Sequence, residues 1–112
     1  MMYETELGVQ YDGARALHYY EQAAALDDVE AIYYLGMIYY EQLLNVDEDL
    51  FKSKELFMRA AEHGHIDALF NCGYFFECGI GGERNLEKAL FYYDRAALCG
   101  DEEAKNRAQQ LR

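Results

Sequence analysis

The sequence predicts an all-α fold in which antiparallel helix pairs stack into an α-solenoid. Three observations predict it: a repeated motif, helical spacing of apolar residues, and the absence of any strand pattern. The repeated motif is an Ala pair that begins at Ala23, Ala60 and Ala96, which lie 37 and then 36 residues apart. A fixed period of this size is typical of repeat architectures built from short supersecondary units.

Composition agrees with helices joined by glycine turns. The chain has 112 residues, which bounds it to one domain, and it contains 9 Gly and 0 Pro. No apolar run is long enough for a membrane span, and no signal peptide is visible at the N-terminus. Cys72, Cys78 and Cys99 fit no zinc spacing or regular pairing, so we expect buried or partly buried thiols in a reducing, cytoplasmic setting.

Residues 1–11 align with the end of a repeat rather than with its beginning. Residues 1–11 are therefore expected to form a loop or short turn, and Asp12 to cap a helix over residues 13–26. Asp49 and Asn85 occupy the equivalent positions in later repeats. Asp and Asn accept backbone N–H bonds at a helix N-terminus, so each position predicts an N-cap.

The remaining helices follow from the apolar pattern and its interruptions. The helix expected over 29–43 places Ala31, Leu35, Ile38 and Tyr39 on one face. The other expected helices cover residues 49–63, 66–78, 86–98 and 101–111, with an acidic linker at 45–48 and a glycine turn at 79–82. The last helix is polar on most faces, as expected of a helix that closes the end of an array.

Glycines inside and after the helices have separate explanations. Gly36 and Gly73 lie one period apart inside helices, where glycine costs about 1 kcal/mol relative to Ala. Both therefore predict close contact with another helix. Gly64 and Gly100 follow helices and predict left-handed helix ends.

These residues resemble the Sel1-like repeat family, a relative of the tetratricopeptide repeats. The resemblance covers nearly the whole chain. The matching residues of the best repeat are Ala68, Gly73, Phe76, Gly79, Gly81, Asn85, Lys88, Ala89, Tyr92, Tyr93, Ala96, Ala97 and Gly100. The middle repeat departs from the pattern at Leu43 and Asn45, where turn glycines are usual, and Cys72 stands where Leu is usual.

The resemblance divides the chain into about two and a half repeats and a cap. We expect a partial repeat at 1–28, repeats at 29–65 and 66–100, and a capping helix at 101–112. It also implies a scaffold or adaptor rather than an enzyme. No cofactor is expected, and no catalytic residue stands out, because no Ser, Cys or Thr has an adjacent base at useful spacing.

Histidines offer the best alternative to a pure interaction role. His63 and His65 flank Gly64, and a histidine pair in a turn could bind metal weakly. A metal site needs three or four ligands, so an exposed turn is the favoured interpretation and no metal is expected.

The binding face is expected on the first helix of each repeat, by analogy with tetratricopeptide repeats. The residues expected to contact a partner are Glu30, Tyr33, Tyr34, Met37, Tyr40, Glu41, Asp67, Phe70, Asn71, Tyr74, Glu77 and Arg107. Aromatic residues are enriched at binding hot spots. The alternative is that several of these tyrosines pack between helices with the hydroxyl in water.

Charge indicates the kind of partner. Ten basic residues against 21 acidic residues give a net charge of -11. This charge repels nucleic acid and would favour a basic protein or peptide, although a solvated acidic surface is the preferred explanation of the charge itself. A further alternative is self-association through an uncapped apolar end near Tyr3, Leu7, Tyr19 and Tyr20.

Overall fold

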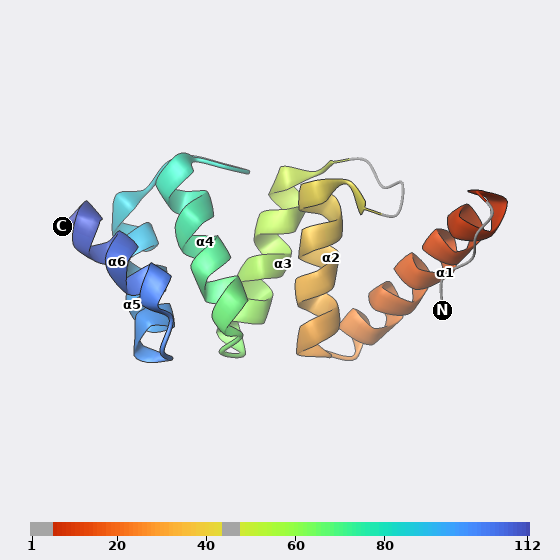
Figure 1. Ribbon diagram of the computed structural model, residues 1–112, viewed down its shortest axis with the longest axis horizontal. Helices are drawn as coiled ribbons and strands as arrows, with labels where there is room; N and C mark the ends of the chain where they lie inside the picture. The colour runs from red at the N-terminus through yellow and green to blue at the C-terminus, as the bar shows by residue number, and fades with distance from the viewer. Residues whose placement is uncertain (1–5, 44–47) are drawn as a thin grey trace.

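The computed structural model describes residues 6–43 and 48–112, with side chains from Arg15 onward. These residues form six α-helices and no strand (Figure 1). The helices are α1 (Glu6–Ala25), α2 (Val29–Glu41), α3 (Leu50–Glu62), α4 (Ile66–Cys78), α5 (Leu86–Leu98) and α6 (Glu102–Leu111).

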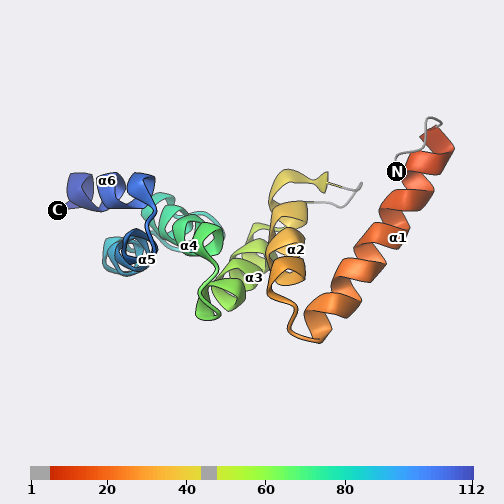
Figure 2. The same ribbon diagram turned by 60° about the horizontal axis from the view of Figure 1, so that its bottom comes forward.

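The helices stack in sequence order into an elongated array of 49 × 24 × 23 Å. Each helix packs chiefly against the helix before it and the helix after it in the chain. Figures 1 and 2 both show the N-terminal part of α1 diverging from α2, so these two helices meet mainly near their connection. The predicted α-solenoid of helix pairs is confirmed.

Side-chain caps begin five of the helices. Asp49 accepts a hydrogen bond from Lys52 N at 3.0 Å, and Asn85 accepts one from Lys88 N at 3.0 Å, as the sequence predicts. Three further helices begin in the same way: α2 at Asp28, α4 at His65 and α6 at Asp101. In each of them the backbone nitrogen lies 3.2 Å from the side-chain acceptor. His65 is the unusual member, because its Nδ1 atom replaces the side-chain oxygen that accepts in the other four caps.

The expectation for Asp12 is wrong, because α1 begins at Glu6 and includes it. Residues 6–11, expected to be loop or turn, are helical; residues 1–5 lie outside the described part. In the last repeat the preceding helix holds the turn: Asn85 N donates to Phe76 O at 2.8 Å, and Arg84 Nε donates to Glu77 O at 2.9 Å. No described helix precedes Glu6 to accept such bonds, so backbone N–H groups bond within the helix instead.

Glycine lets the two helices of each repeat touch. A Cβ atom built on Gly36 would lie 2.7 Å from Phe57 Cε1, and one built on Gly73 would lie 2.6 Å from Tyr93 Cδ1. Ser53 adds a hydrogen bond from its hydroxyl to the Gly36 carbonyl oxygen at 2.8 Å. The close contact predicted from the two glycines is therefore confirmed.

Left-handed residues end several helices. Gly64 and Gly100 have φ of +83° and +102°, as predicted, and Asp27 takes the equivalent place with φ of +64°. After α2 the left-handed residue is Gln42 with φ of +58°, where α4 has Gly79 with φ of +73°. The turn of the middle repeat, which lacks the usual glycines, thus still begins with a left-handed residue. Residues 44–47 of this turn lie outside the described part.

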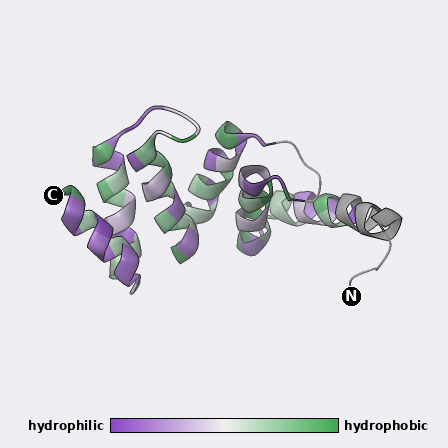
Figure 3. Cartoon of the chain, turned by 45° about the horizontal axis from the view of Figure 1, so that its top comes forward, coloured by the Kyte–Doolittle hydropathy of each residue, from purple (hydrophilic) through white to green (hydrophobic). Residues whose placement is uncertain are grey.

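The core runs along the stack between the helices. Its largest fully buried side chains are Tyr93, Phe57, Phe75, Ile32 and Leu69. The polar helix α6 buries only Ala104 and Ala108, and Figure 3 shows it largely in hydrophilic colours. This agrees with the capping role expected from its sequence.

The cysteines differ from expectation in their exposure. All three are free thiols, and Cys72 is buried, but Cys78 and Cys99 are exposed rather than buried or partly buried. Cys78 ends α4 and Cys99 follows α5, where the side chains leave the helix–helix contact.

Candidate functional site

The predicted partner-binding residues lie along α2 and α4, with Arg107 added from α6. Glu30, Tyr34, Glu41 and Asp67 are exposed. The other predicted residues are half-buried, namely Tyr33, Met37, Tyr40, Phe70, Asn71, Tyr74, Glu77 and Arg107. The positions expected to be structural behave differently: Leu35, Gly36, Cys72 and Gly73 are buried between helices. We call the α2 and α4 residues of the predicted set, together with Arg107, the tyrosine face.

The first part of the tyrosine face is built around His65. The imidazole of His65 stacks on the ring of Tyr33, with ring centroids 4.3 Å apart, and its Nε2 atom lies 3.2 Å from Glu30 Oε2. Because Nδ1 accepts the bond from Ala68 N, the neutral tautomer that fits both contacts carries its proton on Nε2. His65 is thus a packed cap rather than the exposed imidazole that the sequence suggests; its side chain is 10% exposed.

The middle of the face joins α2 to α4. Asn71 Nδ2 lies 3.9 Å from Met37 Sδ, and the ring of Tyr40 lies 5.2 Å from that of Phe75. Burial, and then the charge of Asp67, raise the pKa of Tyr33, while a hydrogen bond with Asn71 acts in the opposite direction. Burial, and then proximity to Tyr74, raise the pKa of Tyr40. Both hydroxyls therefore remain protonated and able to donate hydrogen bonds at neutral pH.

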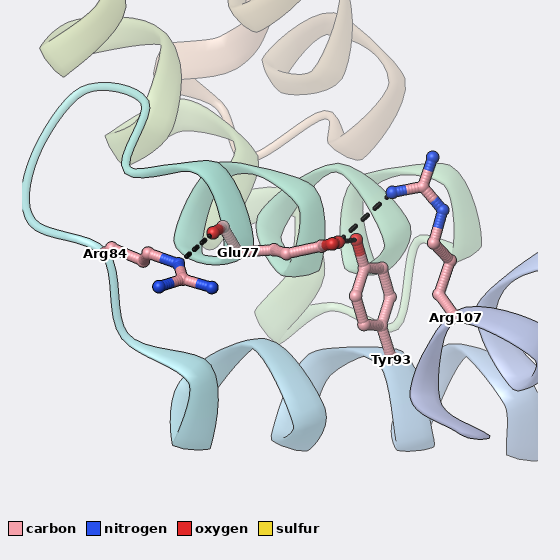
Figure 4. Close-up of polar contacts among 4 residues, drawn as sticks. All are labelled: Glu77, Arg84, Tyr93 and Arg107. Carbon is pink, nitrogen blue, oxygen red and sulfur yellow. Dashed lines mark hydrogen bonds and ion pairs between the residues drawn. The ribbon is translucent and has the colours of Figure 1, made fainter. Parts of the chain in front are cut away.

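The last part of the face is a polar network around Glu77 (Figure 4). Glu77 Oε1 accepts hydrogen bonds from the Tyr93 hydroxyl at 2.7 Å and from Arg107 Nη1 at 3.1 Å. Burial and this contact with Glu77 raise the pKa of Tyr93 strongly. The Arg107 guanidinium also lies 5.5 Å from the ring centroid of Tyr74 and 6.0 Å from that of Phe70.

This network changes the role of two predicted site residues. The carboxylate of Glu77 and the guanidinium of Arg107 already bind each other, so they position Tyr74 and Phe70 rather than offering free charges. Glu41 and Asp67 are exposed acids with no side-chain hydrogen bond or ion pair recorded among the described residues. The negative charge that remains accessible on the face therefore comes from α2 and from the first turn of α4.

Sequence reasoning missed two contributors to the site. Tyr93 reaches the network from α5, and the only signal for it is the register that places it opposite Gly73. His65 could have been found because it stands where Asp28 and Asp101 stand in the other repeats.

Metal centres and membrane spans are two other classes of functional element. Within residues 6–43 and 48–112, no group of three or more His, Cys, Asp or Glu side chains is placed to hold a metal ion. Among the helices described, none is both long enough and apolar enough to cross a membrane.

The repeat geometry and the glycine contacts agree with the comparison to known families. The Sel1 repeat family model matches residues 1–28, 29–65 and 66–101. The chain belongs to the Sel1 repeat family. The resemblance drawn from the Ala pairs and the helical glycines is therefore confirmed.

Curated Sel1 relatives are much longer than this chain. It is 37% identical over 109 residues to chitin synthase regulator SKT5 of Malassezia restricta, which covers 94% of this chain and 7% of that protein. It is 33% identical over 97 residues to rat DAP3-binding cell death enhancer 1, which covers 87% of this chain and 18% of that protein. The likeness therefore concerns a small part of each relative.

A solved structure shows the same Sel1 fold. The crystal structure of a Sel1 repeat protein from Oxalobacter formigenes superposes with a TM-score of 0.81 at 32% sequence identity. The match covers 85% of this chain and 27% of the other.

Proposed function

We propose that this chain is a non-enzymatic interaction module that binds a basic peptide or protein segment on its tyrosine face. The observation that carries the proposal is the row of half-buried aromatic rings on α2 and α4, flanked by the exposed acids Glu41 and Asp67. Rigid aromatic residues supply binding area at a low entropic cost, and nearby acids select a basic partner.

Two observations support a role in recognition. One of the relatives is a regulator of chitin synthase by name, and the other is a DAP3-binding protein by name. The rings of the face are also held in place: Tyr33 by His65, and Tyr74 by Arg107. A preorganised face loses less conformational entropy when it binds. Three unpaired thiols support the cytoplasmic location expected from the sequence.

Selection from a displayed random peptide library on the full chain tests the proposal. We expect the selected peptides to be rich in Lys and Arg, and their affinity to fall by about tenfold when Tyr40 and Tyr74 are replaced by Ala. Phe91→Ala is the matched control, because Phe91 is a 53% exposed aromatic residue on α5, away from this face. Unchanged affinity in the double variant would exclude the tyrosine face.

Charge reversal separates the basic preference from the face itself. The double variant Glu41→Lys, Asp67→Lys should bind the selected basic peptides with lower affinity than the original chain does. The salt dependence of this binding should also be smaller. Two results would contradict the basic preference: selected peptides without an excess of Lys and Arg, or a double variant whose peptide binding depends on salt as much as that of the unaltered chain. Neither result would contradict binding on the tyrosine face itself.

Self-association is the second candidate function, and one observation favours it. Tyr19 on α1 is 62% exposed, and Leu26 beside the end of α1 is 84% exposed. Apolar surface of this kind invites contact with another molecule. Sedimentation equilibrium over a wide range of concentrations tests it, and a mass that stays monomeric throughout would exclude it. Of the other residues expected at this end, Tyr3 and the side chain of Leu7 lie outside the described part.

A further inference from the structure

Two lysine side chains from different helices meet on one aromatic ring. Nζ of Lys54, on α3, lies 4.0 Å from the ring centroid of Phe76 on α4. Nζ of Lys88, on α5, lies 5.4 Å from the same centroid. The face of an aromatic ring attracts an ammonium group and favours its charged form. Three helices therefore bring two positive charges together at the surface of a strongly acidic protein.

No acid of the described residues neutralises this lysine pair. Every ion pair found within residues 6–43 and 48–112 has an arginine or a histidine as its cation. Burial, and then the charge of Lys88, lower the pKa of Lys54, whereas Cys72 and Glu83 act in the opposite direction. The two ammonium groups thus repel each other, and an anion bound to both would relieve this repulsion.

The glycine turn at residues 79–82 lies directly on Lys54. It is found at the same end of the array as the start of α3, at the top of Figure 1. A Cβ built on Gly81 would lie 2.5 Å from the carbonyl oxygen of Leu50, and one built on Gly82 would lie 2.7 Å from Nζ of Lys54. In the part of the chain that the structure describes, the N–H groups of Gly82 and Glu83 donate no hydrogen bond. The turn therefore offers backbone donors beside the amine.

The preceding repeat lacks this combination. Lys52 occupies the position of Lys88 and lies 4.8 Å from the ring centroid of Tyr39. One period before Lys54, however, the chain has Leu17. A single lysine on a ring thus occurs in both repeats, whereas the second lysine and the glycine turn occur together only at Phe76 among the described residues.

We propose that Lys54, Lys88 and the glycine turn form a binding site for a phosphomonoester group. Its oxygens accept hydrogen bonds from both ammonium groups and from a backbone N–H of the turn. A phosphomonoester carries a charge of about −1.5 to −2 at neutral pH, which matches two ammonium groups better than the single charge of a carboxylate does.

The overall charge limits the ligand to a single phosphoryl group. The net charge of -11 repels a polyanion such as nucleic acid. Repulsion of a small anion by distant acids is screened beyond about 8 Å at physiological ionic strength, so local contacts decide its binding. The site shares no residue with the tyrosine face and adds a contact of opposite charge preference.

An NMR titration of the full, isotope-labelled chain tests the site. The probe is a short, otherwise uncharged peptide with one phosphoserine, and matched peptides carry Ser or Glu in its place. Shifts of the Gly82 and Glu83 amide signals report binding at the turn. We expect saturable shifts with a Kd in the millimolar range for the phosphoserine peptide, as a few charge-assisted contacts at an exposed site allow. The Glu peptide should bind severalfold more weakly, and the Ser peptide should cause no shift.

Variants of the chain separate the site from general electrostatics. Lys54→Gln and Lys88→Gln should each weaken the phosphoserine peptide by about tenfold, because each removes one charge-assisted hydrogen bond. Gly82→Ala should also weaken it, since the added Cβ displaces the amine of Lys54. Lys105→Gln is the matched control, because it removes the same charge from an exposed lysine of α6 and should change the affinity little. Circular dichroism of each variant confirms that its helices are intact.

Three results would overturn the proposal: no saturable shift at Gly82 and Glu83, equal affinity for the phosphoserine and Glu peptides, or equal weakening by Lys105→Gln and Lys54→Gln. Titration with inorganic phosphate identifies the source of the group. Tighter binding than that of the peptide assigns the site to a small phosphorylated compound, and weaker binding assigns it to a phosphorylated partner; both agree with the proposal. Tyr40 and Tyr74 are unaltered in these variants, so peptide binding on the tyrosine face is tested separately.

Discussion

The ring of Phe57 occupies the space where Gly36 would otherwise carry a side chain, with its Cε1 atom 2.7 Å from a Cβ built on the glycine. Tyr93 and Gly73 repeat the relationship in the next repeat at 2.6 Å. A glycine and an aromatic ring at nearly the same distance thus join the helices of both complete repeats, and the predictions begin with this joint.

Replacing Gly36 or Gly73 with Ala should destabilise the chain. Ala favours a helix interior over Gly by about 1 kcal/mol, but overpacking of a core costs about 1–3 kcal/mol. The two neighbouring rings are fully buried and cannot move aside into solvent. We expect a net loss of roughly 1 kcal/mol in the free energy of unfolding, measured by urea denaturation.

Gly82→Ala is the control for the glycine joint. The atom nearest to a Cβ at Gly82 is Nζ of Lys54, the mobile end of a long side chain, so little change in stability is expected. Gly36→Ala or Gly73→Ala variants as stable as the original chain would show that the joint relaxes without cost.

Gln42 offers a place where stability can be gained. It adopts φ of +58°, a left-handed conformation in which a side chain costs about 1–2 kcal/mol. Replacement by glycine removes this steric cost, but glycine loses more chain entropy on folding, and this loss offsets part of the gain in stability. We therefore expect Gln42→Gly to raise the free energy of unfolding by about 0.5–1 kcal/mol.

The reverse exchange checks the cause of the Gln42 effect. Gly79 occupies the equivalent left-handed position after α4, with φ of +73°. Gly79→Gln should lower the stability by a similar amount in the same denaturation assay. A Gln42→Gly variant that is no more stable than the original chain, or a Gly79→Gln variant that is no less stable, would show that the left-handed backbone is not the cause.

His65 combines a helix cap with a ring contact, and the two can be separated. His65→Ala removes both, and we expect a loss of about 1.5–2.5 kcal/mol from an N-cap and a stacked ring together. His65→Asp restores the cap acceptor but not the ring stacked on Tyr33, so its stability should lie between Ala and His. An Asp variant no more stable than the Ala variant would show that the imidazole acts only through its ring.

Alkaline pH should destabilise the chain through Cys72. Burial raises the pKa of its thiol from the ordinary 9.0 to about 12. Between these values the unfolded chain releases a proton that the folded chain keeps, so stability is fully present below pH 9 and declines as pH rises toward 12. One such group contributes a slope of at most about 1.4 kcal/mol per pH unit.

The Cys72→Ala variant should show a smaller slope than the original chain when urea denaturation is compared at pH 8 and at alkaline pH. Tyr92 and Tyr93, whose pKa values are also raised by burial, contribute to the slope that remains. Cys99→Ala is the control, since that thiol is exposed. Identical slopes for the Cys72 variant and the original chain would exclude Cys72 as a source.

Sequence patterns predicted the fold where the cause is local or repeated. The boundaries of α4 and α5, Ile66–Cys78 and Leu86–Leu98, agree with the expected ranges because caps and left-handed ends mark them. Asp12 was misjudged because its capping role depends on a preceding helix that holds the turn. The motif at 8–12 resembles the later turn, but the described structure contains nothing for that turn to bind.

The tyrosine face shows the same division between local and distant causes. The helical spacing of Tyr33, Tyr40 and Tyr74 was enough to place them on α2 and α4. The pairing of Glu77 with Arg107 joins residues 30 positions apart, and it depends on how α6 packs. No single-sequence pattern reports such a contact, so the sequence predicts Glu77 as a partner-binding residue and not as a member of an internal pair.

The stacking of each helix on its chain neighbours has a consequence for how this protein can vary. Because backbone contacts lie almost entirely between adjacent helices, and the side-chain contacts described above reach no further than the second helix along the chain, a helix pair could be inserted or removed without disturbing the joints elsewhere. Length would then change in whole steps of one repeat, and each step would lengthen the row of rings on the tyrosine face. A longer or shorter ligand could be matched by counting repeats, with no redesign of those already present.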